Sequence, residues 1–155
     1  MHKNARRVVE AARELGLDIE PQEFDEHTRT AEDAARTIGV TVGQIVKSLV
    51  FLVDDLPVLA LVSGDNLLDE AKLAAAAGGG EVTRADANKV REVTGYPVGG
   101  VPPLGHAQPL RVFVDEDLCR HDVVWAAAGT PHCNFSIAPA DLVRATGGAV
   151  CQLAR

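Results

Sequence analysis

The sequence IVKSLVFLV occupies residues 45–53 of a chain of 155 residues. Its β-branched and aromatic residues are typical of a β-strand that is buried on both faces. Lys47 lies inside this apolar run, and moving an ammonium group out of water is costly unless an opposite charge pairs with it. We therefore expect Lys47 to line a cleft that holds an anion or an oxygen that becomes negative. The alternative is an edge strand, where a lysine blocks unwanted pairing and extends its ammonium group to water.

The residues after this strand predict a β-hairpin. Asp54-Asp55-Leu56-Pro57 has the composition of a turn, and residues 58–62 have that of a second strand. A polar loop, Ser63-Gly64-Asp65-Asn66, then leads away from the end of the second strand. This hairpin is the clearest pair of strands that the sequence indicates.

The rest of the chain alternates between helical and extended patterns. Apolar spacing, capping residues and glycine stops predict helices at residues 4–16, 30–39, 42–44, 69–77, 86–94 and 141–146. Alternating apolar residues bounded by turns predict strands at residues 19–24, 110–114, 123–127 and 134–137. We expect one α+β domain over residues 1–155, with a mixed sheet and helices packed around it.

The composition is that of an ordinary globular protein. Apolar residues make up 46% and charged residues 24% of the chain, and a chain of this length buries roughly 70% of its unfolded surface. No apolar run approaches the roughly 20 residues that a membrane helix needs. Residues 1–7 lead into an amphipathic helix pattern rather than a signal peptide. We therefore expect a cytoplasmic protein that does not enter a membrane.

The charge and the aromatic content limit the nucleic-acid partners. The net charge of -7 argues against a protein that binds long stretches of DNA or RNA, because phosphate neutralisation supplies most of that affinity. Aromatic residues are only 4% of the chain, which argues against stacking of several single-stranded bases. A small terminal portion of a nucleic acid entering a pocket is compatible with both observations.

The cysteines predict neither disulfides nor a metal site. The chain has three cysteines, Cys119, Cys133 and Cys151, which cannot all pair with one another, and it contains no Cys-x-x-Cys motif. His121 and His132 stand near two of these cysteines, but adjacent residues such as His132 and Cys133 point to opposite faces of a strand. Cys133 has no helix N-terminus before it that would lower its pKa for nucleophilic attack. We expect no metal and no cofactor.

A glycine- and proline-rich loop spans residues 95–106 and ends at His106. It lacks the Gly-Lys-Ser/Thr ending of a phosphate-binding P-loop. Glycines leave backbone groups uncovered and prolines hold them still, so Gly99–Pro103 is expected to wall a pocket that rejects bulky groups. The alternative is a surface crossover without a ligand. His106 and His132 each follow a turn, where an imidazole serves as an acid, a base or a phosphate ligand, or simply as a surface residue.

Familiar catalytic motifs are missing from the sequence. It contains no Gly-x-Ser-x-Gly elbow, no His-Glu-x-x-His helix and no dinucleotide-binding fingerprint. The commonest hydrolase and oxidoreductase classes are therefore not indicated.

Four segments taken together carry a family resemblance. They are IVKSLVF at residues 45–51, LVSGD at 61–65, GGVPP at 99–103 and AGTPH at 128–132. In this order they resemble the YbaK/EbsC-like family, the free-standing relatives of the editing domain of bacterial prolyl-tRNA synthetases. The resemblance runs from about residue 18 to residue 148. It implies a single domain of this type, with a mixed, mostly antiparallel sheet surrounded by helices.

The resemblance also implies an activity. Family members act in trans and hydrolyse the ester that joins a wrong amino acid to the 3′ end of a tRNA. The family lysine and its Gly-x-x-x-Pro loop carry over onto Lys47 and onto Gly99, Gly100, Val101 and Pro103. An activated ester needs only a positioned water and donors for the developing oxyanion. The family is thought to use the terminal ribose hydroxyl or the substrate itself to help activate water, which would explain the missing triad.

The remaining candidates concern substrate binding and partners. Residues expected at the pocket are Thr28, Thr30, Ser63, Asp65, His106, Gly129, Thr130 and His132. The expected partner is the acceptor end of a tRNA carrying alanine, cysteine, serine or threonine, with a synthetase partner left open and no DNA. Two alternatives stand beside this hypothesis. One is a module that binds a nucleotide or aminoacyl-adenylate without hydrolysis, and the other is a partner protein of a synthetase or elongation factor.

Overall fold

The computed structural model describes residues 1–24, 28 and 30–155, and its strands form two sheets. One sheet has five strands in the order β4-β2-β3-β5-β8, and the other has three in the order β1-β7-β6. The strands are β1 (Gln22–Glu23), β2 (Val46–Val53), β3 (Leu56–Ser63), β4 (Val82–Arg84), β5 (Arg111–Asp115), β6 (Val124–Ala127), β7 (Cys133–Ile137) and β8 (Ala149–Cys151). The helices are α1 (Lys3–Glu14), α2 (Ala31–Ile38), α3 (Glu70–Ala76), α4 (Ala87–Thr94) and α5 (Pro139–Thr146), with 3-10 turns η1 (Val42–Gln44) and η2 (Glu116–Arg120).

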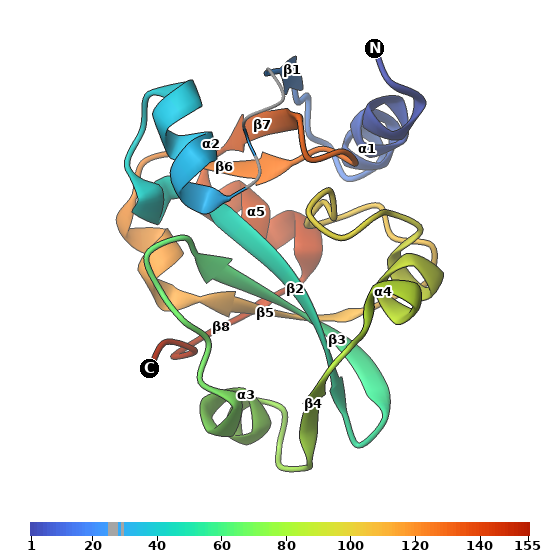
Figure 1. Ribbon diagram of the computed structural model, residues 1–155, viewed down its shortest axis with the longest axis vertical. Helices are drawn as coiled ribbons and strands as arrows, with labels where there is room; N and C mark the ends of the chain where they lie inside the picture. The colour runs from blue at the N-terminus through green and yellow to red at the C-terminus, as the bar shows by residue number, and fades with distance from the viewer. Residues whose placement is uncertain (25–27, 29) are drawn as a thin grey trace.

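The hairpin of β2 and β3 forms the centre of the larger sheet (Figure 1). Its antiparallel register runs from Val46 opposite Ser63 to Val53 opposite Leu56. The two turn residues between the strands, Asp54 and Asp55, both have positive φ, as a tight two-residue hairpin turn requires. The predicted hairpin is therefore confirmed, and β3 begins two residues earlier than expected.

The expected α+β class with mostly antiparallel pairing is confirmed. Parallel pairing occurs between β3 and β5 and between β5 and β8, whereas the other strand pairs are antiparallel. The sequence pattern did not predict that the strands divide between two sheets. A single parallel bridge between Ile45 and Trp125 joins the start of β2 to the smaller sheet.

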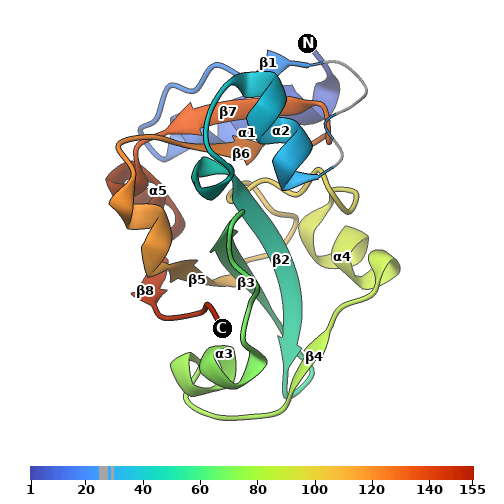
Figure 2. The same ribbon diagram turned by 60° about the vertical axis from the view of Figure 1, so that its left-hand side comes forward.

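Helices cover the two faces of the larger sheet unequally (Figures 1 and 2). On one face, α1, α4, α5 and the smaller sheet pack in a large core that includes Leu59, Leu61 and Phe135. On the other face, α3 contributes Leu73 to a smaller core around Phe51 and Phe113. The side chains of β2 alternate between these cores, as they must in a strand with period two.

Local sequence signals set the limits of the helices. Thr30 Oγ1 accepts a hydrogen bond from Asp33 N at 3.0 Å, and Gly39 ends α2 with a φ of 89°. The last helix, α5, begins at Pro139, two residues before the predicted start, because proline is well accommodated in the first turn. Among the helices of the described residues, none combines the length and apolarity needed to cross a membrane.

Candidate functional site

A pocket of about 310 Å³ lies beside the first half of β2. Four parts of the chain surround it: the start of α2, the strand β2, the loop after α4 and the β6–β7 hairpin (Figure 2). Its lining residues are Thr28, Thr30, Ala31, Ala34, Ile45, Val46, Lys47, Ser48, Leu49, Val98, Gly99, Val101, Ala127, Pro131 and Asn134. We refer to this cavity as the β2 pocket. Its size is that of a small-molecule site.

The β2 pocket contains an open stretch of strand edge. β4 pairs with β2 only from Phe51 to Val53, and the bridge to the smaller sheet is at Ile45. Backbone groups alternate along a strand, and Val50 O accepts a hydrogen bond from Ala85 N on the β4 side. The backbone N–H and C=O of Ser48 therefore face that same side, where no strand of the described residues pairs with them.

Lys47 lies in the β2 pocket and is half-buried. Its Nζ donates a hydrogen bond to Asn66 O, in the loop after β3. Burial lowers the pKa of Lys47, and the nearby carboxylates of Glu32, Asp115 and Asp65 oppose that shift. At Lys47 the strand β2 pairs with β3 but not with β4, so its edge is open there, yet the ammonium group bonds to the Asn66 carbonyl rather than extending free into water.

Two polar side-chain atoms of residues that line the β2 pocket are buried and have no hydrogen-bond partner in the described part of the chain. They are Ser48 Oγ and Asn134 Nδ2. A buried polar atom without a partner costs about 1–3 kcal/mol, so such atoms are rare and call for an explanation. Sequence reasoning missed both residues. The available signal was a polar side chain inside an otherwise apolar strand.

The Gly99–Pro103 loop contributes only part of its length to the pocket. Gly99 and Val101 line it, whereas Gly100 and Pro103 do not. Gly100 packs against the β6–β7 turn so closely that a Cβ would lie 2.8 Å from Thr130 Cα. The absence of a side chain at residue 100 therefore lets two backbone segments meet at the pocket wall.

His106 lies outside the lining of the β2 pocket. Its Nε2 is 2.7 Å from Pro102 O, so the ring forms a hydrogen bond within the glycine- and proline-rich loop. Burial lowers the pKa of His106, and the hydrogen bond with Pro102 partly offsets this effect. The structure thus gives His106 a contact with the loop rather than with the pocket.

The β6–β7 turn reaches the pocket through Pro131 rather than through the residues that the sequence singled out. Thr28 lines the pocket, and its Oγ1 donates to Pro131 O at 3.1 Å. His132 Nδ1 lies 3.3 Å from the same hydroxyl. Gly129 packs on Asn4 of α1, and Thr130 Oγ1 accepts from His132 N at 3.3 Å. Gly129, Thr130 and His132 therefore support the pocket wall from outside.

Ser63 and Asp65 lie beyond the pocket. Ser63 is buried, and its Oγ donates to Gly43 O at 2.7 Å, so its hydroxyl joins β3 to η1. Asp65 is exposed near Gly43. Of the expected site residues, the structure brings together Thr28, Thr30, Lys47, Gly99 and Val101 in one cavity.

Residues 25–145 match the family model of the aminoacyl-tRNA editing domain. The chain belongs to this family. The family expected from the sequence is therefore confirmed.

Individual relatives agree with the family assignment. The uncharacterized protein YwhH of Bacillus subtilis is 35% identical over 121 residues, which cover 77% of this chain and 76% of YwhH. The Enterococcus faecalis protein "Putative Cys-tRNA(Pro)/Cys-tRNA(Cys) deacylase EbsC" is 28% identical over 97% of this chain and 92% of its own. A proline–tRNA ligase of Maridesulfovibrio salexigens is 42% identical over 57% of this chain, but the match covers only 15% of the ligase.

Solved structures show the same fold. The crystal structure of "a putative trans-editing enzyme for prolyl tRNA synthetase" superimposes with a TM-score of 0.96 and 44% sequence identity. The match covers 100% of this chain and 99% of that chain. The whole fold is therefore shared with that structure.

Proposed function

We propose that residues 1–155 act as a single trans-editing domain that hydrolyses the ester between a small amino acid and the 3′ end of a tRNA. The observation that carries this proposal is the β2 pocket. A lysine, an open strand edge and two residues with unpartnered polar atoms in the described part of the chain line this one cavity. The names of the relatives, a deacylase and a trans-editing enzyme, support the same reaction.

Each group in the β2 pocket has a chemical use with an aminoacyl ester. Lys47 holds the terminal phosphate or the ester oxygen by its charge. The hydroxyl of Ser48, the amide of Asn134 and the backbone of Ser48 offer hydrogen bonds to the amino acid and to the reacting water. The Gly99–Val101 backbone limits the size of the amino-acid side chain.

The reaction itself needs no covalent intermediate. Water attacks the ester carbonyl carbon, and the carbonyl oxygen becomes negative in the tetrahedral intermediate. The bond to the ribose oxygen then breaks, and the proton from water passes to that oxygen, which leaves a free amino acid and uncharged tRNA. Donors that are already fixed stabilise the oxyanion without reorganisation.

Size selects small substrates only coarsely. An apolar pocket separates side chains that differ by one methylene by about 1–3 kcal/mol. Alanine, cysteine, serine and threonine therefore remain candidate substrates, and hydrogen bonds from Ser48 and Asn134 would favour the polar members of this group.

A deacylation panel tests the proposal. Purified protein is mixed with tRNAs charged with alanine, cysteine, serine, threonine and proline, and release of each amino acid is followed over time. We expect rapid release of at least one small amino acid by catalytic amounts of protein. Saturable binding of charged tRNA without release over the whole panel would instead indicate a binding module.

A further inference from the structure

A chain of hydrogen bonds links Lys47 to the buried carboxylate of Asp115 and the half-buried carboxylate of Asp117. Lys47 Nζ donates to the backbone carbonyl of Asn66. The side chain of the same asparagine contacts a polar cluster formed by Asp115 and Asp117. Asn66 therefore contacts the ammonium group with its main chain and the interior of the protein with its carboxamide.

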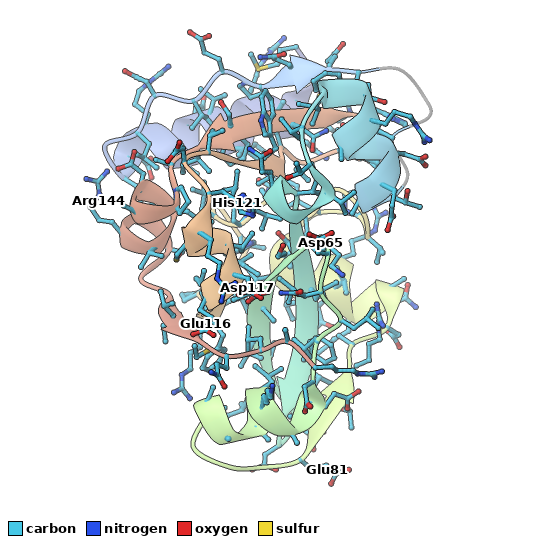
Figure 3. The ribbon with its side chains drawn as sticks, turned by 90° about the vertical axis from the view of Figure 1, so that its left-hand side faces the viewer. Asp65, Glu81, Glu116, Asp117, His121 and Arg144 are labelled. Carbon is cyan, nitrogen blue, oxygen red and sulfur yellow. The ribbon has the colours of Figure 1, made fainter. Side chains whose placement is uncertain are left out.

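The carboxamide of Asn66 is clamped between two elements. Its Nδ2 donates to Asp115 Oδ2 at the end of β5 and to Asp117 Oδ2 on η2, both at 2.8 Å. Ionised carboxylates only accept hydrogen bonds, so the amide nitrogen must face them and both of its hydrogens are used. Figure 3 shows the labelled Asp117 on η2, on the same face as Asp65.

Asp115 gives this clamp a rigid base. Its side chain is fully buried, and Oδ2 also accepts a hydrogen bond from Ser63 N at 3.0 Å. Oδ1 accepts from Asp117 N at 3.0 Å, so the carboxylate joins β3, β5 and η2. Three elements thus fix one end of the Asn66 side chain, whereas its backbone belongs to a short polar loop.

We propose that Asn66 is a positioning residue that fixes the ammonium group of Lys47 at the β2 pocket through its clamped carboxamide. A lysine side chain has several rotatable bonds, and a fixed acceptor restricts them. This inference rests on the proposed function, because the restriction of the Lys47 side chain has a purpose only if the ammonium group must meet an aminoacyl ester in the pocket. The same buried Asp115, together with Asp65 of the loop and Glu32 of α2, surrounds the ammonium group with negative charge.

A double-mutant cycle tests whether Asn66 acts through Lys47. Single-turnover deacylation is measured for Asn66→Ala, Lys47→Ala and the double variant, with Asn88→Ala as the control because Asn88 is exposed on α4. We expect Asn66→Ala to slow the chemical step by about tenfold to a hundredfold with little change in KM, as for a misplaced group. The double variant should be no slower than Lys47→Ala alone. A further loss of similar size in the double variant would overturn the proposal.

A second variant keeps the proposal testable if Asn66→Ala fails to fold. Asp117→Ala removes one of the two carboxylates that hold the amide and leaves the buried Asp115 in place. We expect it to fold and to cause a smaller loss of rate in the same direction. Unchanged kinetics in a folded Asp117→Ala variant and in a folded Asn66→Ala variant would contradict the clamp.

A measurement without substrate separates this inference from the proposed function. In protein with 13C-labelled lysines, the Lys47 signal is assigned by its loss in Lys47→Arg. We expect Asn66→Ala to shift this signal toward the position of mobile lysines, and Asn88→Ala to leave it unchanged. An unshifted signal rejects the positioning role even if the enzyme is active. A shifted signal in a protein that releases no amino acid supports the positioning role and rejects the deacylase.

Discussion

Lys47 and Ser48 are neighbours in sequence, and their side chains leave β2 on opposite faces. Adjacent strand residues seldom share one site for this reason. Both nevertheless line the β2 pocket, because the pocket extends around the unpaired edge of the strand. The open edge thus lets a lysine, a serine and an unpaired peptide unit line one cavity.

We expect Ser48 to lower the stability of the fold and to raise the deacylation activity. Its hydroxyl is buried without a partner in the described residues, so Ser48→Ala should increase the free energy of unfolding by about 1 kcal/mol. The same change should lower kcat/KM for a polar aminoacyl ester by about tenfold, because a hydrogen bond to substrate is lost. Denaturant unfolding and deacylation kinetics measure the two effects. Ser136→Ala, at an exposed position of β7, should change neither; equal activity of Ser48→Ala and wild type would remove Ser48 from the site.

His106 should make stability depend on pH. Its folded-state pKa lies below the ordinary 6.5 because burial disfavours the charged ring. The unfolded chain therefore binds a proton first as pH falls through 6.5, and this lowers the stability of the wild type relative to His106→Gln. Above 6.5 the difference in free energy of unfolding between the two proteins should be constant. Denaturant titrations over a pH series check this, and a difference that moves in favour of the wild type at low pH would be inconsistent with a buried neutral ring.

Sequence reasoning identified some of the residues that line the β2 pocket. Lys47 was identifiable because a charge inside an apolar strand is costly, and Gly99 because glycine and proline alternate in its loop. Ser48 and Asn134 were not, because a serine or asparagine in a strand is unremarkable until the partners of its polar atoms are known. His106 was expected at the substrate, but only the fold shows that its ring faces Pro102.

At the scale of elements, the pocket wall depends on contact between two backbone segments. The loop after α4 packs on the β6–β7 turn at Gly100, where a Cβ would lie 2.8 Å from Thr130 Cα and 3.0 Å from Gly129 O. Backbone atoms cannot move aside as a flexible side chain can. The loop and the turn can therefore approach this closely only because residue 100 has no side chain.

Gly100→Ala should move the loop away from the turn and enlarge the pocket. We expect a loss of deacylation, and a loss of discrimination against larger amino acids, because the Gly99–Val101 wall shifts. The control is Gly16→Ala, at a positive φ with open space around it, which should cost about 1 kcal/mol of stability without changing activity. Thermal unfolding and the amino-acid panel distinguish the two. Wild-type selectivity in Gly100→Ala would show that the contact does not shape the pocket.

The elements that sequence reasoning found are those with strong local signals, such as the β2–β3 hairpin and the capped helix α2. The missed elements, β4, η2 and β8, have only three to five residues each. A strand as short as Val82–Arg84 has too few residues to show alternation, and it exists because β2 offers it a partner from Phe51 to Val53. The division into two sheets also depends on long-range pairing rather than on local pattern.

At the scale of the whole molecule, charge limits how much of a tRNA the protein can hold. The net charge is -7, and Asp65, Glu116 and Asp117 lie on the face seen in Figure 3. Such a surface repels phosphates, so the expected contact is confined to the terminal nucleotides at the β2 pocket.

An acceptor-stem minihelix should therefore be as good a substrate as a complete tRNA. We expect similar kcat/KM values for the two when they carry the same small amino acid. We also expect only a shallow dependence of KM on salt, because few phosphates are neutralised. Steady-state kinetics over a salt series measure both. A much lower kcat/KM for the minihelix, or a steep salt dependence, would require contacts beyond the acceptor end.

The role of Lys47 is tested most directly by its removal. Single-turnover release of a small amino acid from charged tRNA is compared for wild type, Lys47→Ala and Lys72→Ala. Lys72 is a matched control, since it is also half-buried and its Nζ also donates to a backbone carbonyl, that of Ala154, and it does not line the β2 pocket. We expect Lys47→Ala to lose at least about a hundredfold in rate while it stays folded, and Lys72→Ala to keep the wild-type rate. Wild-type deacylation by a folded Lys47→Ala variant would contradict the role assigned to the β2 pocket.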